Sequence, residues 1–244
     1  MKRIKRDEFE KKISLCLEAG DTVMVHSSLS KIGYFEFGIQ GIIDILENII
    51  GPNGHLVMLS ATYSFSNTGI FDYNNSKAET GSLVETFRKN INVLRSQVPM
   101  ASFVSKSEQF TKRYNSYLDK SSPMMELLKN NAKILLIGVD YNKCTTFHLA
   151  EERLKVKYNK YIEFSGKMIK DSIEEHISQR YYVRKDLSLM KDVTHVGQHM
   201  ERDKLVKKIK IGDGYIRCFE MKVFDTYCTN ELNKDINSFI KKKI

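Results

Sequence analysis

The chain is poor in the residues that divide or anchor proteins. It has only three prolines among 244 residues, and no stretch rich in proline, glycine and serine separates one part from another. Its longest apolar runs, such as 134–139, are far too short to cross a bilayer, and the charged first residues carry no apolar secretory segment. We therefore expect one large domain that is cytoplasmic and has no membrane partner.

Cysteine is also scarce, and the four cysteines are Cys16, Cys144, Cys218 and Cys228. They lack CxxC spacing, which predicts free thiols in a reducing compartment. His195 and His199 stand four residues apart, as some metal ligands do, but no third ligand is evident, so we predict no metal site. The motifs GxxxxGKS/T and GxGxxG are missing as well, which argues against the usual nucleoside triphosphate and dinucleotide sites.

The sequence carries an excess of basic residues. The formal net charge is +9, and the basic residues are spread along the chain among acidic ones. No nucleic-acid-binding motif accompanies them, so a non-catalytic DNA- or RNA-binding protein remains only a distant alternative, and we expect no nucleic-acid partner. A basic surface also suits substrates rich in phosphate, such as coenzyme A or nucleotide-linked sugars.

Strand-like and helix-like segments alternate through the first two thirds of the chain. The predicted strands are 21–26, 55–59 and 133–139. The predicted helices are 5–19, 39–50, 81–89 and 124–129. Segments 62–75 and 94–103 show no clear period and are expected to be irregular. This alternation predicts an α/β fold with a mixed or parallel sheet.

The pattern changes after about residue 155. Segments 156–164 and 215–224 are strand-like, whereas 200–209 and 226–240 favour helices. We therefore expect a single mixed-sheet domain over residues 1–244, with a core at 5–155. The C-terminal extension, 156–244, is expected to form a smaller α+β part of the same domain.

The most informative segment follows the strand predicted at 133–139. A hydroxyl pair, Thr145 and Thr146, opens a predicted helix with His148 in its first turn and Glu151 three residues further. Residues three apart share a helix face, so the carboxylate could orient the imidazole as a general base. A cap by Thr145 would place His148 where the helix dipole favours the neutral ring, whereas Glu151 favours the charged one. Spacing alone somewhat favours a plain surface salt link.

A second candidate is the polar loop over 27–33, between a predicted strand and a predicted helix. Ligands of α/β sheets collect at the carboxyl ends of strands, where hydroxyls and backbone N–H groups can hold phosphates. An ordinary polar connection is the alternative for this loop. Cys144 could serve as a nucleophile, but an unpaired thiol is more often a small core residue.

Several of these segments together resemble the aminoglycoside 3-N-acetyltransferase-like family, the antibiotic acetyltransferases. The segments that carry the resemblance, in chain order, are HSSLSKIG at 26–33, GPNGHLVM at 51–58, FD at 71–72, GSLVETFR at 81–88, RSQVP at 95–99, SP at 122–123, LLIGV at 135–139 and TFHLAE at 146–151. Their order makes the match specific over roughly 5–155. Two positions depart from the family pattern: Val98 replaces a histidine, and Gly38 stands where paired glycines are common.

The resemblance implies the antibiotic acetyltransferase fold and direct transfer of acetyl from acetyl-coenzyme A to a primary amine of an amino sugar. It implies that His148 is the base and Glu151 orients it, with Thr146 as a further catalytic residue and Ser28 as another donor for the oxyanion. The implied cofactor-binding residues are Ser27, Ser28, Leu29, Ser30, Lys31, Gly33, Arg95 and Ser96. The implied substrate-binding residues are Tyr63, Asp72 and Glu85.

The net charge bears on the acceptor amine. Aminoglycosides are polycations, and a basic protein suits them less than it suits an anionic acceptor. We therefore expect a nucleotide-linked amino sugar destined for surface polysaccharide, with an aminoglycoside and antibiotic resistance as the close alternative. The sequence leaves regioselectivity and the formation of a homo-oligomer open.

Overall fold

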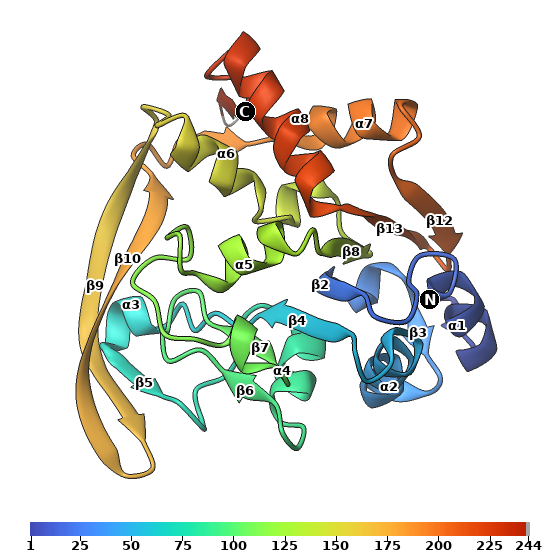
Figure 1. Cartoon of the computed structure of the whole chain (residues 1–244), viewed down its shortest axis with the longest axis horizontal. Coiled ribbons are helices and arrows are strands. Elements are labelled where there is room, and N and C mark those ends of the chain that lie inside the picture. Colours follow the sequence, from blue (N-terminus) through green and yellow to red (C-terminus); the bar gives the residue numbers. More distant parts are fainter. Residues whose placement is uncertain (243–244) are drawn as a thin grey trace.

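A seven-stranded mixed sheet organises the computed structural model, which describes residues 1–242 (Figure 1). Its strands, in order across the sheet, are β12 (Lys207–Ile211), β13 (Gly214–Glu220), β8 (Lys133–Ile137), β2 (Thr22–Ser27), β4 (His55–Leu59), β7 (Phe103–Ser105) and β6 (Leu94–Arg95). The three central strands, β8, β2 and β4, run parallel, and antiparallel strands extend both sides. The predicted mixed α/β fold is therefore confirmed.

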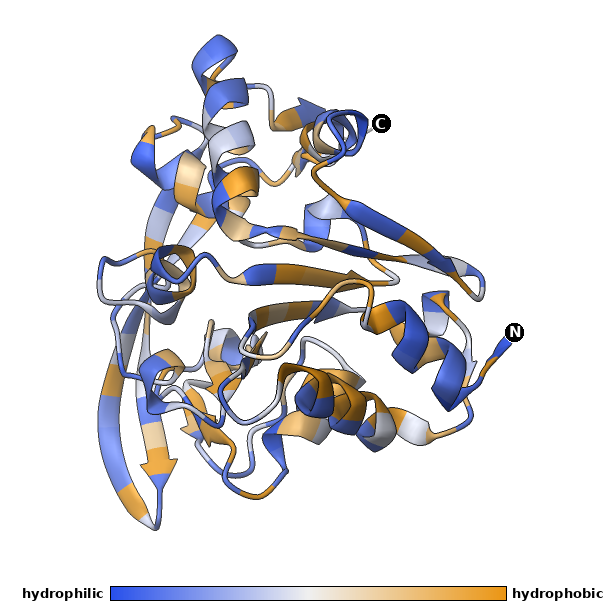
Figure 2. Cartoon of the chain, turned by 45° about the vertical axis from the view of Figure 1, so that its right-hand side comes forward, coloured by the Kyte–Doolittle hydropathy of each residue, from blue (hydrophilic) through white to orange (hydrophobic). Residues whose placement is uncertain are grey.

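Helices cover both faces of this sheet because its central strands are apolar on both faces. Along β2, Val23 and Val25 pack on one side, and Met24 packs on the other. The first face is covered by α1 (Arg6–Ile13), α2 (Gly38–Ile50) and α4 (Ser82–Arg88). The second face is covered by α5 (Pro123–Lys129), α6 (Phe147–Arg153), α7 (Thr194–Arg202) and α8 (Met221–Lys234). Figure 2 shows the hydrophobic colour concentrated on the central strands and on α2.

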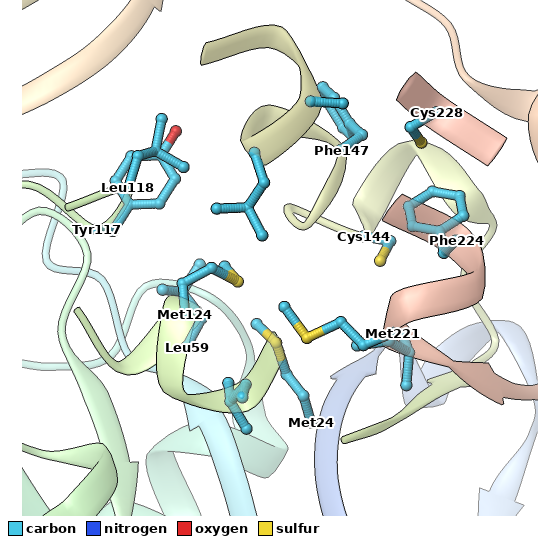
Figure 3. Packing of buried hydrophobic residues seen from close by; sticks show 14 of the residues in the cluster. Met24, Leu59, Tyr117, Leu118, Met124, Cys144, Phe147, Met221, Phe224 and Cys228 are labelled. Carbon is cyan, nitrogen blue, oxygen red and sulfur yellow. The ribbon is translucent and has the colours of Figure 1, made fainter. Parts of the chain in front are cut away.

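The second face holds the larger cluster of buried side chains. Met24 from β2 lies beside Met221 from α8, and Phe224 of α8 and Phe147 of α6 belong to the same cluster (Figure 3). Burying a side chain of this size contributes about 1.5–3 kcal/mol, so this packing fixes α6 relative to the sheet. The position of α6 matters because it carries His148 and Glu151.

A long hairpin stands beside the main sheet. Its strands, β9 (Asn159–Lys170) and β10 (Ile173–Arg184), pair over their full length, and β5 (Ile70–Asp72) pairs in parallel with β9. Asp171 and Ser172 form a two-residue turn with left-handed φ values of 50° and 67°, which matches the twist of antiparallel strands. The far end of the hairpin brings the last residues of β10 beside α6 (Figure 1).

The remaining elements are short. They are β1 (Arg3–Ile4), β3 (Tyr34–Phe35), α3 (Phe65–Thr68), β11 (Leu189–Lys191), β14 (Ile240–Lys242), and three single 3₁₀ turns, η1 (Leu29–Lys31), η2 (Glu108–Phe110) and η3 (Tyr141–Lys143). The strand β1 pairs with β3, and β11 pairs with β14. Within residues 1–242 no helix is both long enough and apolar enough to cross a membrane.

Several sequence-based boundaries were wrong, and tertiary pairing explains most of them. Segment 200–209 was expected to be helical, but α7 ends at Arg202 and the alternating sequence of β12 pairs with β13. Segment 62–75, expected to be irregular, contains α3 and a strand that pairs with β9 nearly 100 residues later. The first helix ends at Ile13 rather than near residue 19.

Candidate active site

The carboxyl ends of β2, β4 and β8 share one edge of the sheet, and a cavity of about 470 Å³ opens there. We call it the strand-end cavity. Its lining residues are Val25, His26, Ser27, Ser28, Lys31, Leu59, Tyr63, Thr80, Val84, Val139, Asn142, Lys143 and Thr145. Two of these side chains, Lys31 and Lys143, carry a positive charge, and the lining includes no acidic residue.

The backbone at this edge is packed closely enough to require a glycine. Gly138 follows β8 with a left-handed φ of +71°, and a Cβ there would clash with the carbonyl oxygen of Ser28. The N–H of Ser28 also donates to the carbonyl of Ile137 at 2.8 Å. The loop after β2 is therefore held against the end of β8, which fixes Ser27 and Ser28 beside the cavity.

A second cavity of about 680 Å³ adjoins the first, and we call it the His148 cavity. Its lining residues are Asp140, Asn142, Lys143, Phe147, His148, Tyr181, Tyr182, Val183, Arg184, Leu187, Met190 and Lys191. Asn142 and Lys143, both in η3, line the two cavities. One molecule at the strand ends and another beside His148 would therefore meet near this turn.

The structure brings His148 and Glu151 together as predicted from their spacing. Nδ1 of His148 lies 2.6 Å from Oε2 of Glu151, and Lys191 Nζ lies 2.5 Å from the same oxygen. The amide of Asn159 donates to that oxygen as well, at 3.0 Å. Glu151 is 0% exposed and the His148 side chain only 16%, so the pair is no surface salt link.

The charges of this cluster determine which nitrogen of His148 is free. Burial opposes ionisation of Glu151, but the adjacent His148 and Lys191 outweigh it and lower the carboxyl pKa to about 2. Burial, followed by the charge of Lys191, lowers the pKa of His148 below its ordinary value, although Glu151 acts in the opposite direction. The ring is therefore neutral near pH 7. Because the ionised carboxylate can only accept, Nδ1 carries the proton and Nε2 keeps a free lone pair.

Aromatic rings enclose this cluster. The ring centroid of Phe147 lies 4.1 Å from that of His148. The rings of Tyr117 and Tyr182 stand edge-on to the imidazole, with centroid distances of 6.0 and 6.4 Å. These rings restrict the imidazole and exclude water from one side of it, which strengthens the electrostatic interactions within the cluster.

The predicted cofactor-binding residues fall into two groups. Ser27, Ser28 and Lys31 line the strand-end cavity, and Leu29, Ser30 and Gly33 belong to the same loop and turn. Arg95 at the end of β6 and Ser96 directly after it are instead buried. The Arg95 guanidinium donates to Ser102 Oγ, Thr62 Oγ1 and the carbonyls of Ser60 and Ser76. Arg95 is thus engaged in holding protein loops together, and its assignment to the cofactor stays a prediction.

The predicted substrate-binding residues are also divided. Tyr63 lines the strand-end cavity. The Asp72 carboxylate accepts from the N–H groups of Asn74 and Asn75, and Glu85 binds Arg88 and the N–H of Ala78. Within residues 1–242, neither Asp72 nor Glu85 lines one of the two cavities. Their geometry therefore fits a structural role, and substrate binding by them stays a prediction.

The hydroxyl pair before α6 differs in detail from what we expected. The N-cap position belongs to Thr146, and neither Thr145 nor Thr146 forms a side-chain hydrogen bond with the described part of the chain. The predicted cap by Thr145 is therefore wrong. Thr145 lines the strand-end cavity, whereas Thr146 is fully buried, so its catalytic assignment stays a prediction.

Cys144 lies in the core rather than in a cavity. It is 0% exposed, and Figure 3 shows it near Phe224 and Cys228 of α8. Burial raises the pKa of its thiol to about 12, which disfavours the thiolate that a nucleophile needs. Across residues 1–242 no cluster of histidine, cysteine, aspartate and glutamate has the makings of a metal site.

Sequence reasoning missed the residues that reach His148 from the C-terminal extension. Lys191 comes from β11, Asn159 from the start of β9, and Tyr182 from β10. These side chains lie 8 to 43 residues beyond the pair that they contact. No local spacing links them to His148, so only the path of the hairpin and of β11 reveals them.

Comparison with known proteins places the chain among its relatives. Residues 24–231 match the family model described as aminoglycoside 3-N-acetyltransferase. The SPbeta prophage-derived aminoglycoside N(3')-acetyltransferase-like protein YokD of Bacillus subtilis is 29% identical over 247 residues, covering 90% of this chain and 88% of that protein. Aminoglycoside N(3)-acetyltransferase IV of Salmonella sp is 30% identical over 197 residues, covering 74% of each chain.

Solved structures share the fold. The binary complex of AAC-IIIb with CoASH superposes with a TM-score of 0.81 at 19% identity, covering 96% of this chain and 97% of that one. The family model spans most of the chain. The resemblance is confirmed: the chain belongs to the aminoglycoside 3-N-acetyltransferase family, whose members are acetyl-CoA-dependent N-acetyltransferases.

Proposed function

We propose that this chain transfers the acetyl group of acetyl-CoA directly to a primary amine of an amino sugar, with His148 as the general base. The observation that carries the proposal is the 2.6 Å contact between His148 Nδ1 and the buried Glu151, which leaves Nε2 free to take a proton. General bases need this combination of a free lone pair and a fixed ring.

The strand-end cavity suits the donor. Lys31 and Lys143 offer positive charge for the phosphates of coenzyme A, and Ser27 and Ser28 offer polar groups beside them. A pantetheine arm in this cavity could extend toward Asn142 and Lys143, where the two cavities meet. This arrangement would bring the thioester close to an amine held in the His148 cavity.

The proton and bond changes balance without a covalent enzyme intermediate. The acceptor arrives as an ammonium ion, and Nε2 of His148 removes one proton while Glu151 stabilises the imidazolium. The amine nitrogen then attacks the thioester carbonyl, and collapse of the tetrahedral oxyanion breaks the carbon–sulfur bond. The imidazolium proton passes to the departing thiolate, and the nitrogen of the adduct releases its second proton to solvent, which yields the neutral amide and free coenzyme A. An acyl-Cys144 route has little support because that thiol is buried with a raised pKa.

Aminoglycosides are the acceptor class that the relatives support best. Aminoglycoside N(3)-acetyltransferase IV carries this substrate in its name, and a histidine-to-alanine mutant of AAC(3)-IVa is described in complex with a gentamicin. We therefore place an aminoglycoside first among the acceptors to be tested, ahead of the nucleotide-linked amino sugar expected from net charge alone.

One observation favours an anionic acceptor as the second candidate. Lys191 is neutralised by Glu151, and among the other charged residues lining the His148 cavity, Lys143 and Arg184 outnumber Asp140. Such a cavity repels a polycation and attracts an amino sugar that carries a phosphate or a nucleoside diphosphate. Arg184 donates one N–H to the carbonyl of Leu189, and its other nitrogens could bind such a group.

A thiol-release assay tests the proposal and separates the two acceptors. Purified protein is incubated with acetyl-CoA and, separately, gentamicin, glucosamine and a UDP-linked amino sugar. Activity with at least one amine that is lost in His148→Ala supports the proposed reaction. His176→Ala, which alters an exposed histidine on the hairpin, is the matched control. Failure of every amine, or full activity of His148→Ala, would overturn the proposal.

A charge variant in the cavity identifies the acceptor class. Arg184→Gln should lower kcat/KM for an anionic amino sugar, because it removes an attractive charge. The same change should raise kcat/KM for gentamicin, because it removes a repulsive one. A response in the same direction for both acceptors would contradict the role of cavity charge.

A further inference from the structure

A lysine from the far end of the chain enters the His148–Glu151 pair. Lys191 lies at the end of β11, 43 residues after His148, in the C-terminal extension. Its side chain is only 14% exposed, which is unusual for lysine. A buried ammonium must be stabilised by attractive contacts, and Lys191 has several.

The contacts of Lys191 converge on the pair. Its Nζ lies 2.5 Å from Glu151 Oε2 and 3.2 Å from His148 Nδ1. The rings of Phe147, Tyr158 and Tyr182 lie 5.4 to 5.8 Å from the ammonium, within the range of cation–π attraction. One carboxylate and three aromatic faces therefore hold the charge in place.

This placement changes the charge that His148 experiences. Three charged side chains face the ring: Glu151 from its own helix, Lys191 from β11 and Arg184 from β10. Tyr117 and Tyr182 also face the ring, and burial keeps both phenols protonated. Without Lys191, the carboxylate 2.6 Å from Nδ1 would act on the ring without the ammonium that opposes it, and it would favour the protonated imidazole.

We propose that Lys191 is a positioning residue for His148, which cancels the charge of Glu151, fixes that carboxylate on the Nδ1 side and keeps the ring neutral with Nε2 free. A carboxylate bound by both partners can orient the imidazole without holding it as an imidazolium. This inference rests on the proposed function only for its catalytic meaning, since the neutral state of the ring can be measured without any substrate.

The same geometry implies an effect on turnover. Once His148 has taken the proton from the acceptor, the imidazolium lies beside the ammonium of Lys191. Repulsion between the two cations weakens the hold on the proton and favours its transfer to the leaving thiolate. Lys191 itself donates no proton in this sequence and contacts no reacting atom.

An NMR titration of the free full-length protein tests the proposal. The chain has six histidines, and the ring signal of His148 is assigned by its loss in His148→Asn. In the wild type it should titrate below pH 6.5. In Lys191→Met it should titrate about 1–2 pH units higher, because a nearby positive charge has been removed. Lys191→Arg, which keeps the charge, should stay within about 0.5 units of the wild type.

The control and the opposite perturbation make the result specific. Lys185→Met removes an exposed charge six residues away, and it should leave the titration of His148 unchanged. Glu151→Gln should lower the pH at which His148 titrates, because the charge of Lys191 then acts on the ring without the opposing carboxylate. A folded Lys191→Met protein whose His148 titrates as in the wild type would overturn the proposal.

Loss of the fold in Lys191→Met would not end the test. The double variant Glu151→Gln/Lys191→Met leaves neither charge unpaired, and its His148 should titrate higher than that of Glu151→Gln. Equal values in these two variants would overturn the proposal. Failure of the thiol-release assay, by contrast, would reject the proposed reaction and leave this electrostatic result intact.

Discussion

Replacing Glu151 with glutamine is the sharpest single perturbation of this site. The substitution keeps the size of the side chain and removes its charge. It leaves the ammonium of Lys191 without a counterion and the Nδ1–H of His148 with a weaker acceptor. Both consequences are measurable, one as stability and the other as turnover.

The structure sets the size of the stability effect. Two unit charges about 4 Å apart attract by about 4 kcal/mol at an effective dielectric constant of about 20. Removing one partner of a buried pair costs about 3–5 kcal/mol. Glu151 is fully buried, but Lys191 keeps some solvent contact and can release its proton. We therefore expect a loss of about 3 kcal/mol, which a domain of ordinary stability survives.

The assay is urea unfolding of four proteins: the wild type, Glu151→Gln, Lys191→Met and the double variant. The double variant should recover much of the stability lost in Glu151→Gln, because no charge is left unpaired. Thiol release from acetyl-CoA should fall about 10²–10⁴-fold in Glu151→Gln, since the imidazolium loses its stabilising anion.

The pH dependence of the stability difference between wild type and Glu151→Gln tests whether charge holds this cluster. The folded pKa of Glu151 is about 2, below the ordinary 4.5, so its contribution is present above pH 4.5 and lost as pH falls toward 2. The stability difference between wild type and Glu151→Gln should therefore shrink over that range. A difference that stays constant with pH, or effects of Glu151→Gln and Lys191→Met that simply add, would show that packing rather than charge holds this cluster.

Other predictions concern separate residues. His148→Ala should lower kcat by about 10²–10⁴-fold in the thiol-release assay, and retained activity would reject the general base. Cys144→Ala should keep near-normal turnover, because the thiol is buried with a pKa of about 12; an inactive but folded variant would revive the acyl-cysteine route. His26, whose pKa is lowered by burial to about 4, should contribute up to about 3 kcal/mol of stability that is present above pH 6.5 and lost as pH falls to 4. Urea unfolding at several pH values should therefore show a shallower acid loss in His26→Asn, and an unchanged slope would contradict this. Gly138→Ala should destabilise the protein by about 2 kcal/mol or more, because the new Cβ meets the carbonyl of Ser28 and φ is left-handed; a variant with normal thermal stability would show that the loop gives way.

Local chemistry explains why much of the fold was predictable. The central strands are short apolar runs, and α2 repeats isoleucine and leucine at helical spacing up to Gly51. Each pattern needs only neighbours along the chain, so 39–50 and 55–59 were predicted within one residue of the observed α2 and β4. The strands β5 and β11 were missed because their residues pair with segments far away in the sequence.

The sequence alone was enough to identify the family and to pair His148 with Glu151, because both depend on residues close together in the chain. It could not show that Arg95 is engaged in the fold, since that follows from where four distant oxygen atoms lie. Nor could it place Lys191 against the His148–Glu151 pair. That contact exists only because the hairpin and β11 return the chain to α6, and the resulting burial turns a surface-type lysine into the charge that balances the site.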